Sequence, residues 1–296
     1  MNFKKIYENQ LINTYSGILL NYSDFQSGNQ DEITYDFDCE EYKELIEKYQ
    51  LDKIAGKGSD YNRARRLLHY LSPRLAHSSW YDNHVECNAL KLLEYSLNNP
   101  EHGINCLNKS KILEECCLAI GIYARRVAIM PYSPYDFDNH VVVEIYDRKM
   151  KKWIMMDPTS DGIFVDENKI PQSLLEMRDK FSKNEFITYV PCMSKLNNLQ
   201  ALQDKYSEAN AYISKNLFRF VVDKECRFGL PKNRLMFTPI NYSIKDFTIN
   251  NFKFRINNLP KDNENFLKEY YQKLDKAREM KETISTDLSS MEKEPK

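Results

Sequence analysis

Three side chains between residues 103 and 161 have the types and the order that nucleophilic catalysis requires. Cys106 lies at the first turn of a predicted helix, where unpaired N–H groups and the helix dipole favour a thiolate over a thiol. His140 opens the strand-like segment HVVVEIY, and Asp157 ends the segment WIMMD just before a proline. An imidazole can take the thiol proton, and a carboxylate that accepts from the other ring nitrogen can orient the imidazole.

Each of the three residues also has a purely structural interpretation. They could be a small buried thiol, a core histidine and a turn-initiating aspartate before proline. Those separate interpretations leave the order of a helix-start Cys, a strand-start His and a strand-end Asp unexplained. We therefore favour a catalytic triad of Cys106, His140 and Asp157.

The elements that position these residues can be predicted from local signals. Residues 106–120 carry apolar side chains at helical intervals, between the favoured N-cap Asn105 and the favoured C′ residue Gly121. Turn-rich and charged stretches separate three strand-like segments that follow, which predicts an antiparallel meander. The three segments are Arg126–Met130, His140–Tyr146 and Trp153–Asp157.

The remaining chain predicts an α+β fold, with helices first and an antiparallel sheet second. Further helices are predicted at residues 60–71, 89–97, 174–181, 201–215 and 262–282. Alternating apolar residues predict two more strands, Phe218–Val222 and Phe252–Ile256. The predicted units are a mixed N-terminal extension (1–55), a catalytic core (56–245), a C-terminal strand and amphipathic helix (246–283), and a charged, Ser-rich tail (284–296) expected to be disordered.

Composition narrows the class of protein. Lys plus Arg number 42 and Asp plus Glu number 43, which gives a net charge of -1. The chain therefore lacks the excess of basic residues that is typical of a nucleic-acid-binding protein. No apolar run approaches the ~20 residues of a membrane helix, and the first residues do not read as an export signal. Seven irregularly spaced cysteines are typical of reduced thiols, so we expect a cytoplasmic protein that binds neither nucleic acid nor membrane. No metal site is expected, because the candidate ligands His69, His77, His84 and Cys87 lack a second tightly spaced pair.

Three segments of the chain resemble the transglutaminase-like (papain-like) superfamily. They are GINCLNKSKILEECCLAIGIYARRV, DNHVVVEIY and KWIMMDPTSDG. As in that family, the Cys precedes a Gly-Ile-x-Ala-Arg strand entry by 15 residues, the His begins a strand, and the Asp lies in Trp-x-x-x-Asp-Pro-Thr. The resemblance covers residues 60–165, and the segments HYLSPRLAH, IPQSLLEMRDK and YISKNLFRF extend it toward bacterial members of the family. It implies a papain-like/transglutaminase-core fold, in which helices carrying the Cys pack on an antiparallel sheet carrying His and Asp.

The resemblance implies acyl transfer on a peptide or protein amide through a thioester on Cys106. Water as the acceptor would make the protein a peptidase or amidase, which the bacterial resemblance favours, and an amine acceptor would make it a transglutaminase-type crosslinking enzyme. The calcium sites of animal crosslinking enzymes have no counterpart here, so no cofactor is expected. A catalytically silent binding module on the same fold is the alternative from another class, and the sequence leaves the oligomeric state open.

Four residues are candidates for binding the substrate. His77 lies in the HYLSPRLAH segment that is similar to bacterial members, and Asn139 directly precedes His140. Tyr135 lies in an aromatic loop before His140, where a substrate contact and ordinary packing are equally compatible with the sequence. The fourth candidate is Trp80, which together with Asn88 is a candidate side chain for a second oxyanion donor. The expected first donor is the backbone amide of Cys106.

Overall fold

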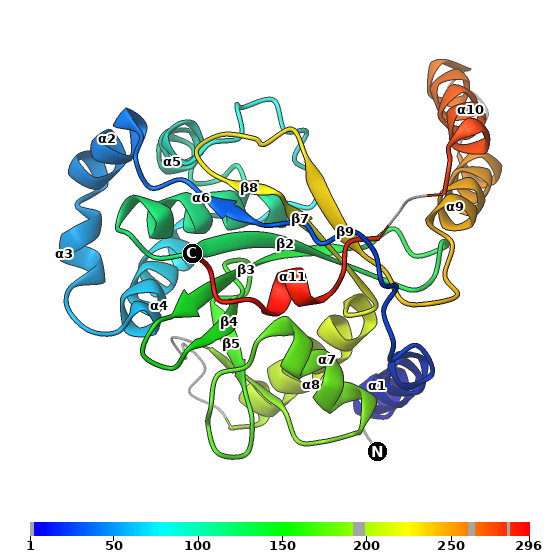
Figure 1. The fold of residues 1–296 in the computed structure, drawn as a ribbon, viewed down its shortest axis with the longest axis horizontal. Coiled ribbons are helices and arrows are strands. Elements are labelled where there is room, and N and C mark those ends of the chain that lie inside the picture. The colour runs from blue at the N-terminus through cyan, green and yellow to red at the C-terminus, as the bar shows by residue number, and fades with distance from the viewer. Residues whose placement is uncertain (1–2, 192–198, 260–263, 283–284) are drawn as a thin grey trace.

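A computed structural model describes residues 3–191, 199–259, 264–282 and 285–296. Its central element is a five-stranded antiparallel sheet with the strand order β4-β3-β2-β7-β9 (Figure 1). These strands are β2 (Ala124–Met130), β3 (His140–Asp147), β4 (Lys152–Met156), β7 (Arg219–Asp223) and β9 (Arg234–Phe237). The predicted meander is confirmed as β2-β3-β4, and the predicted strand Phe218–Val222 is confirmed as β7.

Helix α6 (Cys106–Ala119) packs on this sheet and is buried along almost its whole length. Its N-cap is Asn105, whose side chain accepts from the Asn108 amide at 3.2 Å, and Gly121 just beyond its end has a φ of 77°. Both predicted end signals are therefore confirmed. Polar residues of α6 also enter the core, and Lys111 forms ion pairs there: its ammonium lies 2.9 Å from Glu114 and 3.1 Å from Glu115.

The other helices form two groups around the sheet and α6 (Figure 1). One group contains α2 (Glu40–Tyr49), α3 (Leu51–Ala55), α4 (Asp60–Leu71), the 3₁₀ turn η1 (Ser72–Arg74) and α5 (Ala89–Asn98). The second group contains α1 (Phe3–Asn21), α7 (Leu174–Ser182) and α8 (Leu199–Asn216). The predicted helices at 60–71, 89–97, 174–181 and 201–215 are confirmed. Leu19, Leu45 and Leu51 belong to the same apolar core as the sheet, so the segment predicted as an N-terminal extension packs into the body of the protein.

Two small sheets complete the strands of the described residues. The first pairs β1 (Thr34–Tyr35) with β8 (Glu225–Cys226) in parallel. The second pairs β5 (Gly162–Val165) with β6 (Thr188–Pro191) in antiparallel fashion and follows directly on Asp157. The second sheet thus holds the end of the segment that carries Asp157.

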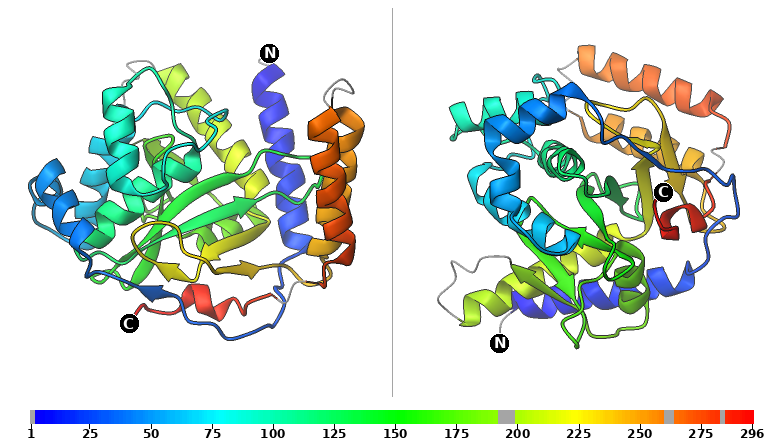
Figure 2. Two further views of the ribbon diagram at one scale, coloured as in Figure 1. Left: turned by 90° about the horizontal axis from the view of Figure 1, so that it is seen from above. Right: turned by 60° about the vertical axis from the view of Figure 1, so that its left-hand side comes forward.

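The predicted strand Phe252–Ile256 is wrong, because these residues lie inside helix α9 (Ile244–Asn258). Alternation of apolar residues over only five positions fits a strand and a helix equally. The helix begins at the N-cap Ser243, whose side chain accepts from the Asp246 amide at 3.0 Å, and the prediction did not use this signal. α9 pairs with α10 (Glu264–Glu279), the predicted C-terminal amphipathic helix, and together they form a hairpin that projects from the body (Figures 1 and 2).

The expectation of a disordered C-terminal tail is also wrong. Residues 285–296, which include the short helix α11 (Ser289–Glu292), run along the sheet face opposite α5 and α6 (Figure 2, left). Met291 is fully buried, the Arg125 guanidinium donates to the Met291 carbonyl at 2.7 Å, and the Trp153 indole donates to the Lys293 carbonyl at 3.1 Å. The polar composition of the tail gives no signal for these contacts, because most of them are made by backbone atoms of the tail. Residue 284 lies outside the described residues.

Two further observations bear on the environment of the protein. No helix among the described residues is long and apolar enough to cross a membrane. All six cysteines in the described part of the chain are free thiols, whereas Cys192 lies outside it.

Candidate active site

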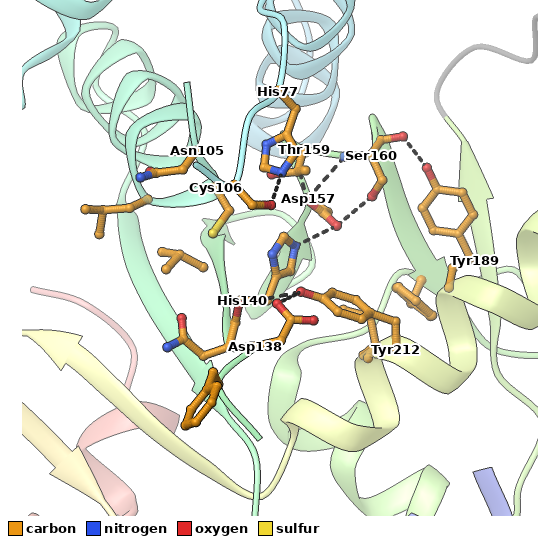
Figure 3. A pocket seen from close by; sticks show the side chains of 18 residues that line it. His77, Asn105, Cys106, Asp138, His140, Asp157, Thr159, Ser160, Tyr189 and Tyr212 are labelled. Atoms are coloured by element: carbon orange, nitrogen blue, oxygen red, sulfur yellow. Dashed lines mark hydrogen bonds and ion pairs between the residues drawn. The ribbon is translucent and has the colours of Figure 1, made fainter. Parts of the chain in front are cut away.

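Cys106 is the first residue of α6, and a small network of asparagines holds that helix end in place. The side chains of Asn105 and Asn108 donate to the side-chain oxygen of Asn83 at 3.0 Å and 2.8 Å. The Cys106 thiol is half-buried and faces a pocket (Figure 3). Because Cys106 is the first helical residue, its backbone N–H has no partner inside the helix and is free for a ligand.

His140 is the first residue of β3, and its buried ring bonds Asp157, which follows the end of β4. The distance from His140 Nε2 to Asp157 Oδ2 is 3.0 Å. The other ring nitrogen is on the side of Cys106, and the Cys106 side chain interacts with the ring (Figure 3). The antiparallel pairing of β3 with β4 creates this contact, because it brings the start of one strand close to the end of the other.

The Asp157 carboxylate is held from several sides. Its Oδ1 accepts from the Thr159 amide at 2.9 Å, and its Oδ2 accepts from the Ser160 hydroxyl at 2.5 Å. The Ser160 carbonyl in turn accepts from the Tyr189 hydroxyl of β6. The carboxylate is therefore fixed in one orientation toward the histidine.

Electrostatics in this buried pair favour its charged form. Burial lowers the pKa of His140, but the charge and hydrogen bond of Asp157 and the interaction with Cys106 outweigh it and raise the pKa to about 10. Burial raises the pKa of Asp157, but His140 and the hydrogen bonds from Ser160 and Thr159 outweigh it and lower the pKa to about 2. At neutral pH the pair is an imidazolium beside a carboxylate.

The pocket that contains these groups has a volume of about 600 Å³. Its polar wall includes the three residues of the predicted triad, His77, Asn139 and the Ser160 side chain. Its apolar wall contains six side chains from α6, α8, β3, β5 and the loop before β3: Leu107, Phe137, Val141, Phe164, Ala209 and Ile213. The space suits a short stretch of polypeptide or a small amide with an apolar acyl part.

Two of the four predicted substrate-binding residues line this pocket and two do not. His77 and Asn139 line it. The Trp80 side chain is 94% exposed and lies outside the pocket lining. Tyr135 is also exposed outside it and packs its ring on Phe254 of α9 at 5.2 Å. Phe137 of the same aromatic loop does line the pocket.

Asn88, a candidate for the second oxyanion donor, has a structural role instead. It is buried as the N-cap of α5, where its side chain accepts from the Lys91 amide at 2.9 Å. The candidate metal ligands are also engaged separately, with His69 bound to Asp161 at 3.3 Å and His84 to Asp82 at 2.5 Å. Among the described residues no group of three or more His, Cys, Asp or Glu side chains converges on a metal position.

Sequence reasoning missed three side chains at the site. The Tyr212 ring of α8 lies edge-on to the His140 ring at 5.4 Å, and its hydroxyl donates to Asp138 at 3.2 Å. Ser160 anchors Asp157, and Lys109 is buried one helical turn after Cys106. Tyr212 carries no local signal, because α8 is distant in the chain. The spacing of Cys106 and Lys109, by contrast, places both on one helix face and could have been noticed.

Part of the chain matches a known protein family. Residues 48–158 match the model of the transglutaminase-like superfamily. The chain therefore contains a transglutaminase-like domain, which confirms the resemblance seen in the sequence motifs, and the matched range includes Cys106, His140 and Asp157. No curated protein matches the chain. Proteins of this superfamily are usually enzymes, and the match makes cysteine-based acyl transfer a possible activity.

Proposed function

We propose that this protein is a cysteine-dependent acyl-transfer enzyme that cleaves a peptide or protein amide through a thioester, with water as the preferred acceptor. The observation that carries the proposal is the position of His140, 3.0 Å from Asp157 on one side and next to the Cys106 thiol on the other. The free thiols of the described cysteines support the accompanying expectation of a reducing, cytoplasmic environment.

The chemistry follows from these groups. The thiolate form of Cys106, whose proton is held by His140 as an imidazolium, attacks the amide carbon. The attack forms a C–S bond and moves the carbonyl electron pair onto oxygen. The Cys106 backbone N–H donates to that oxyanion. When the C=O bond re-forms, the C–N bond breaks and His140 protonates the leaving amine. Water, deprotonated by His140, then attacks the thioester, and the acid and the Cys106 thiol are released.

The first experiment is to acylate Cys106 with p-nitrophenyl acetate and to locate the acetyl group by peptide mapping. Cys106→Ser should abolish acylation, and His140→Ala should slow it by about 10²–10⁴-fold, the usual contribution of a general base. Cys39→Ser is the matched control, because burial raises the pKa of the Cys39 thiol to about 11 and should leave it unreactive. Acylation of Cys106 no faster than that of Cys39 would contradict the proposal and favour the silent binding module.

A second measurement separates hydrolysis from amine transfer. Acetyl-enzyme is allowed to decay in buffer alone and in buffer with increasing concentrations of a primary amine. Decay that is independent of the amine indicates a hydrolase. Decay that accelerates in proportion to the amine, with formation of the acetylated amine, indicates a transglutaminase-type enzyme instead.

A further inference from the structure

Lys109 is a buried cation whose presence beside the site requires an explanation. Lys109 lies three residues after Cys106 on α6, and only 2% of its surface is exposed to solvent. Within the described residues no carboxylate lies within ion-pair distance of its ammonium group. Lys111 of the same helix, by contrast, is equally buried but paired with two glutamates. An unpaired buried charge is costly, so its retention needs a compensating role.

The partners of Lys109 are backbone carbonyls at the end of α4 and η1. The ammonium donates to the Leu75 carbonyl at 2.9 Å and contacts the Ser72 carbonyl at 3.4 Å. A cation at a helix C-terminus is stabilised by the helix dipole. The Ser72 hydroxyl also donates to the Pro158 carbonyl at 2.7 Å, next to Asp157. Lys109 thus joins the first turn of α6 to the segment that leads into His77.

The same segment is joined to the chain just before Cys106. The Ile104 amide donates to the Ala76 carbonyl at 3.1 Å, and the Ser78 amide donates to the Ile104 carbonyl at 3.0 Å. A Cβ at Gly103 would lie 2.5 Å from the His77 carbonyl carbon, so only glycine permits this approach. His77 is therefore held at the pocket wall from two directions, by Lys109 and by the chain that leads into α6.

Three charged groups from three elements act electrostatically on His77: Lys109 of α6, His140 of β3 and Asp157 after β4. Burial, Lys109 and His140 lower the pKa of His77, against the opposing effects of Asp157 and of a hydrogen bond with the Ile104 backbone. Burial also lowers the pKa of Lys109 to about 8, with Asp157 and Asp161 acting against it. Lys109 thus remains mainly charged in neutral solution, where its field acts on His77.

We propose that Lys109 is a positioning residue of this site, which fixes the segment carrying His77 and keeps the His77 ring uncharged in the pocket wall. An uncharged His77 leaves His140 as the one imidazolium next to Cys106 and lets the His77 Nε2 accept from the Ser79 hydroxyl, which is 3.2 Å away in the pocket wall. A protonated His77 would place a second cation beside His140 and lose that acceptor. The fall in the reaction rate at acid pH (the acid limb of the pH profile) is then caused by protonation of His77. This inference rests on the proposed function.

The first test is the NMR titration of the histidine rings in the wild-type protein. The chain has only five histidines, so His77 can be assigned by the signal that is absent from His77→Gln. The His77 signal should titrate below pH 6.5, the ordinary value for histidine. A midpoint at or above 6.5 overturns the proposal, and this result does not depend on any substrate or on the fate of a destabilised variant.

The second test compares Lys109→Met with the wild type. The His77 midpoint should rise by about 0.5–1 pH unit, the effect of one partly screened charge several ångströms away. The acid limb of Cys106 acylation by p-nitrophenyl acetate should move by the same amount, and His77→Gln should remove that limb. A folded Lys109→Met protein with an unmoved His77 midpoint overturns the proposal, since a structural role alone lowers only stability.

Arg178→Met is the matched control. Arg178 is also a buried cation that donates to carbonyls near helix ends, to Leu217 at 3.1 Å and to Tyr22 at 2.6 Å, but it is not among the charged groups that act on His77. Its loss should lower the melting temperature without moving the His77 midpoint. If wild-type Cys106 is not acylated at all, the proposed function fails, while the His77 titration still tests the role of Lys109.

Discussion

At the scale of single residues, the ion pair of His140 and Asp157 links the proposed chemistry to stability. The raised pKa of His140 contributes stability that is complete below pH 6.5 and is lost as the pH rises toward about 10. The lowered pKa of Asp157 contributes stability that is present above pH 3.8 and is lost as the pH falls toward about 2. The pair therefore stabilises the protein most between about pH 4 and 6.5.

Asp157→Asn should be most destabilising in that same pH window. Breaking a buried ion pair costs about 3–5 kcal/mol, and the buried imidazole then loses its proton. Urea unfolding of the variant and the wild type at pH 5.5, 8 and 10 measures the difference, which should shrink as the pH rises. A difference that stays constant over this range would show that His140 is not charged by Asp157.

At the scale of elements, the start of α6 depends on how closely the chain before it approaches residues 76–78. Asn105 caps the helix, and the bridge between His77 and Ile104 sets where Cys106 lies relative to the pocket. Gly103 permits that bridge because a side chain there would collide with backbone atoms of His77 and Ser78. The position of the thiol is thus a property of two segments that lie far apart in the chain.

Gly103→Ala should destabilise the protein by about 1–3 kcal/mol, the usual cost of overpacking, and should slow alkylation of Cys106 by iodoacetamide because the helix start moves. Gly17→Ala is the matched control. Gly17 lies exposed inside α1, and a Cβ added there would have no neighbour within 4 Å, so alanine should stabilise by up to about 1 kcal/mol and leave Cys106 unchanged. Equal effects of the two substitutions would contradict the role of the bridge.

At the scale of the whole molecule, the segment that follows α1 lies beside the C-terminal segment on the sheet face opposite α6. Asn29 accepts from the Asp287 amide at 3.0 Å through its carbonyl, and the Tyr35 ring stacks on Trp153 at 6.0 Å. The C-terminal segment covers the buried ion pair of Arg125 and Glu144, whose closest atoms are 2.7 Å apart. The C-terminal segment therefore acts as part of the core rather than as an appendage.

Removal of residues 285–296 should cost at least about 3 kcal/mol, because the burial of Met291 is lost and because Arg125 and Trp153 each lose the backbone acceptor that this segment supplies. Urea unfolding measures the loss. Removal of residues 294–296 alone is the control and should change stability little, because it keeps both carbonyl acceptors. A full truncation as stable as the wild type would show that the segment contributes nothing to the fold.

The sequence predicts much of this protein where a signal is contained within about ten residues. Local hydrogen bonding predicts the ends of α6, at the cap Asn105 and at Gly121. Side-chain periodicity predicts β2, β3, which begins at His140, and β4, which ends just before Asp157. The order of Cys106, His140 and Asp157 is enough to predict that they form one site. Local alternation failed at α9, where five residues suit a strand or a helix equally.

Only the tertiary structure decides which distant surfaces meet. It places β7 beside β2 and packs the C-terminal segment on the sheet. It also brings Tyr212 and Ser160 into the pocket wall, buries Lys109 against the Leu75 carbonyl, and leaves Trp80 and Tyr135 outside the pocket. The physical reason is that a helix cap, or a turn between adjacent strands, involves only residues that are close together in the chain. A buried cation held by the carbonyls of another segment, or a ring against His140, exists only after those segments have packed together.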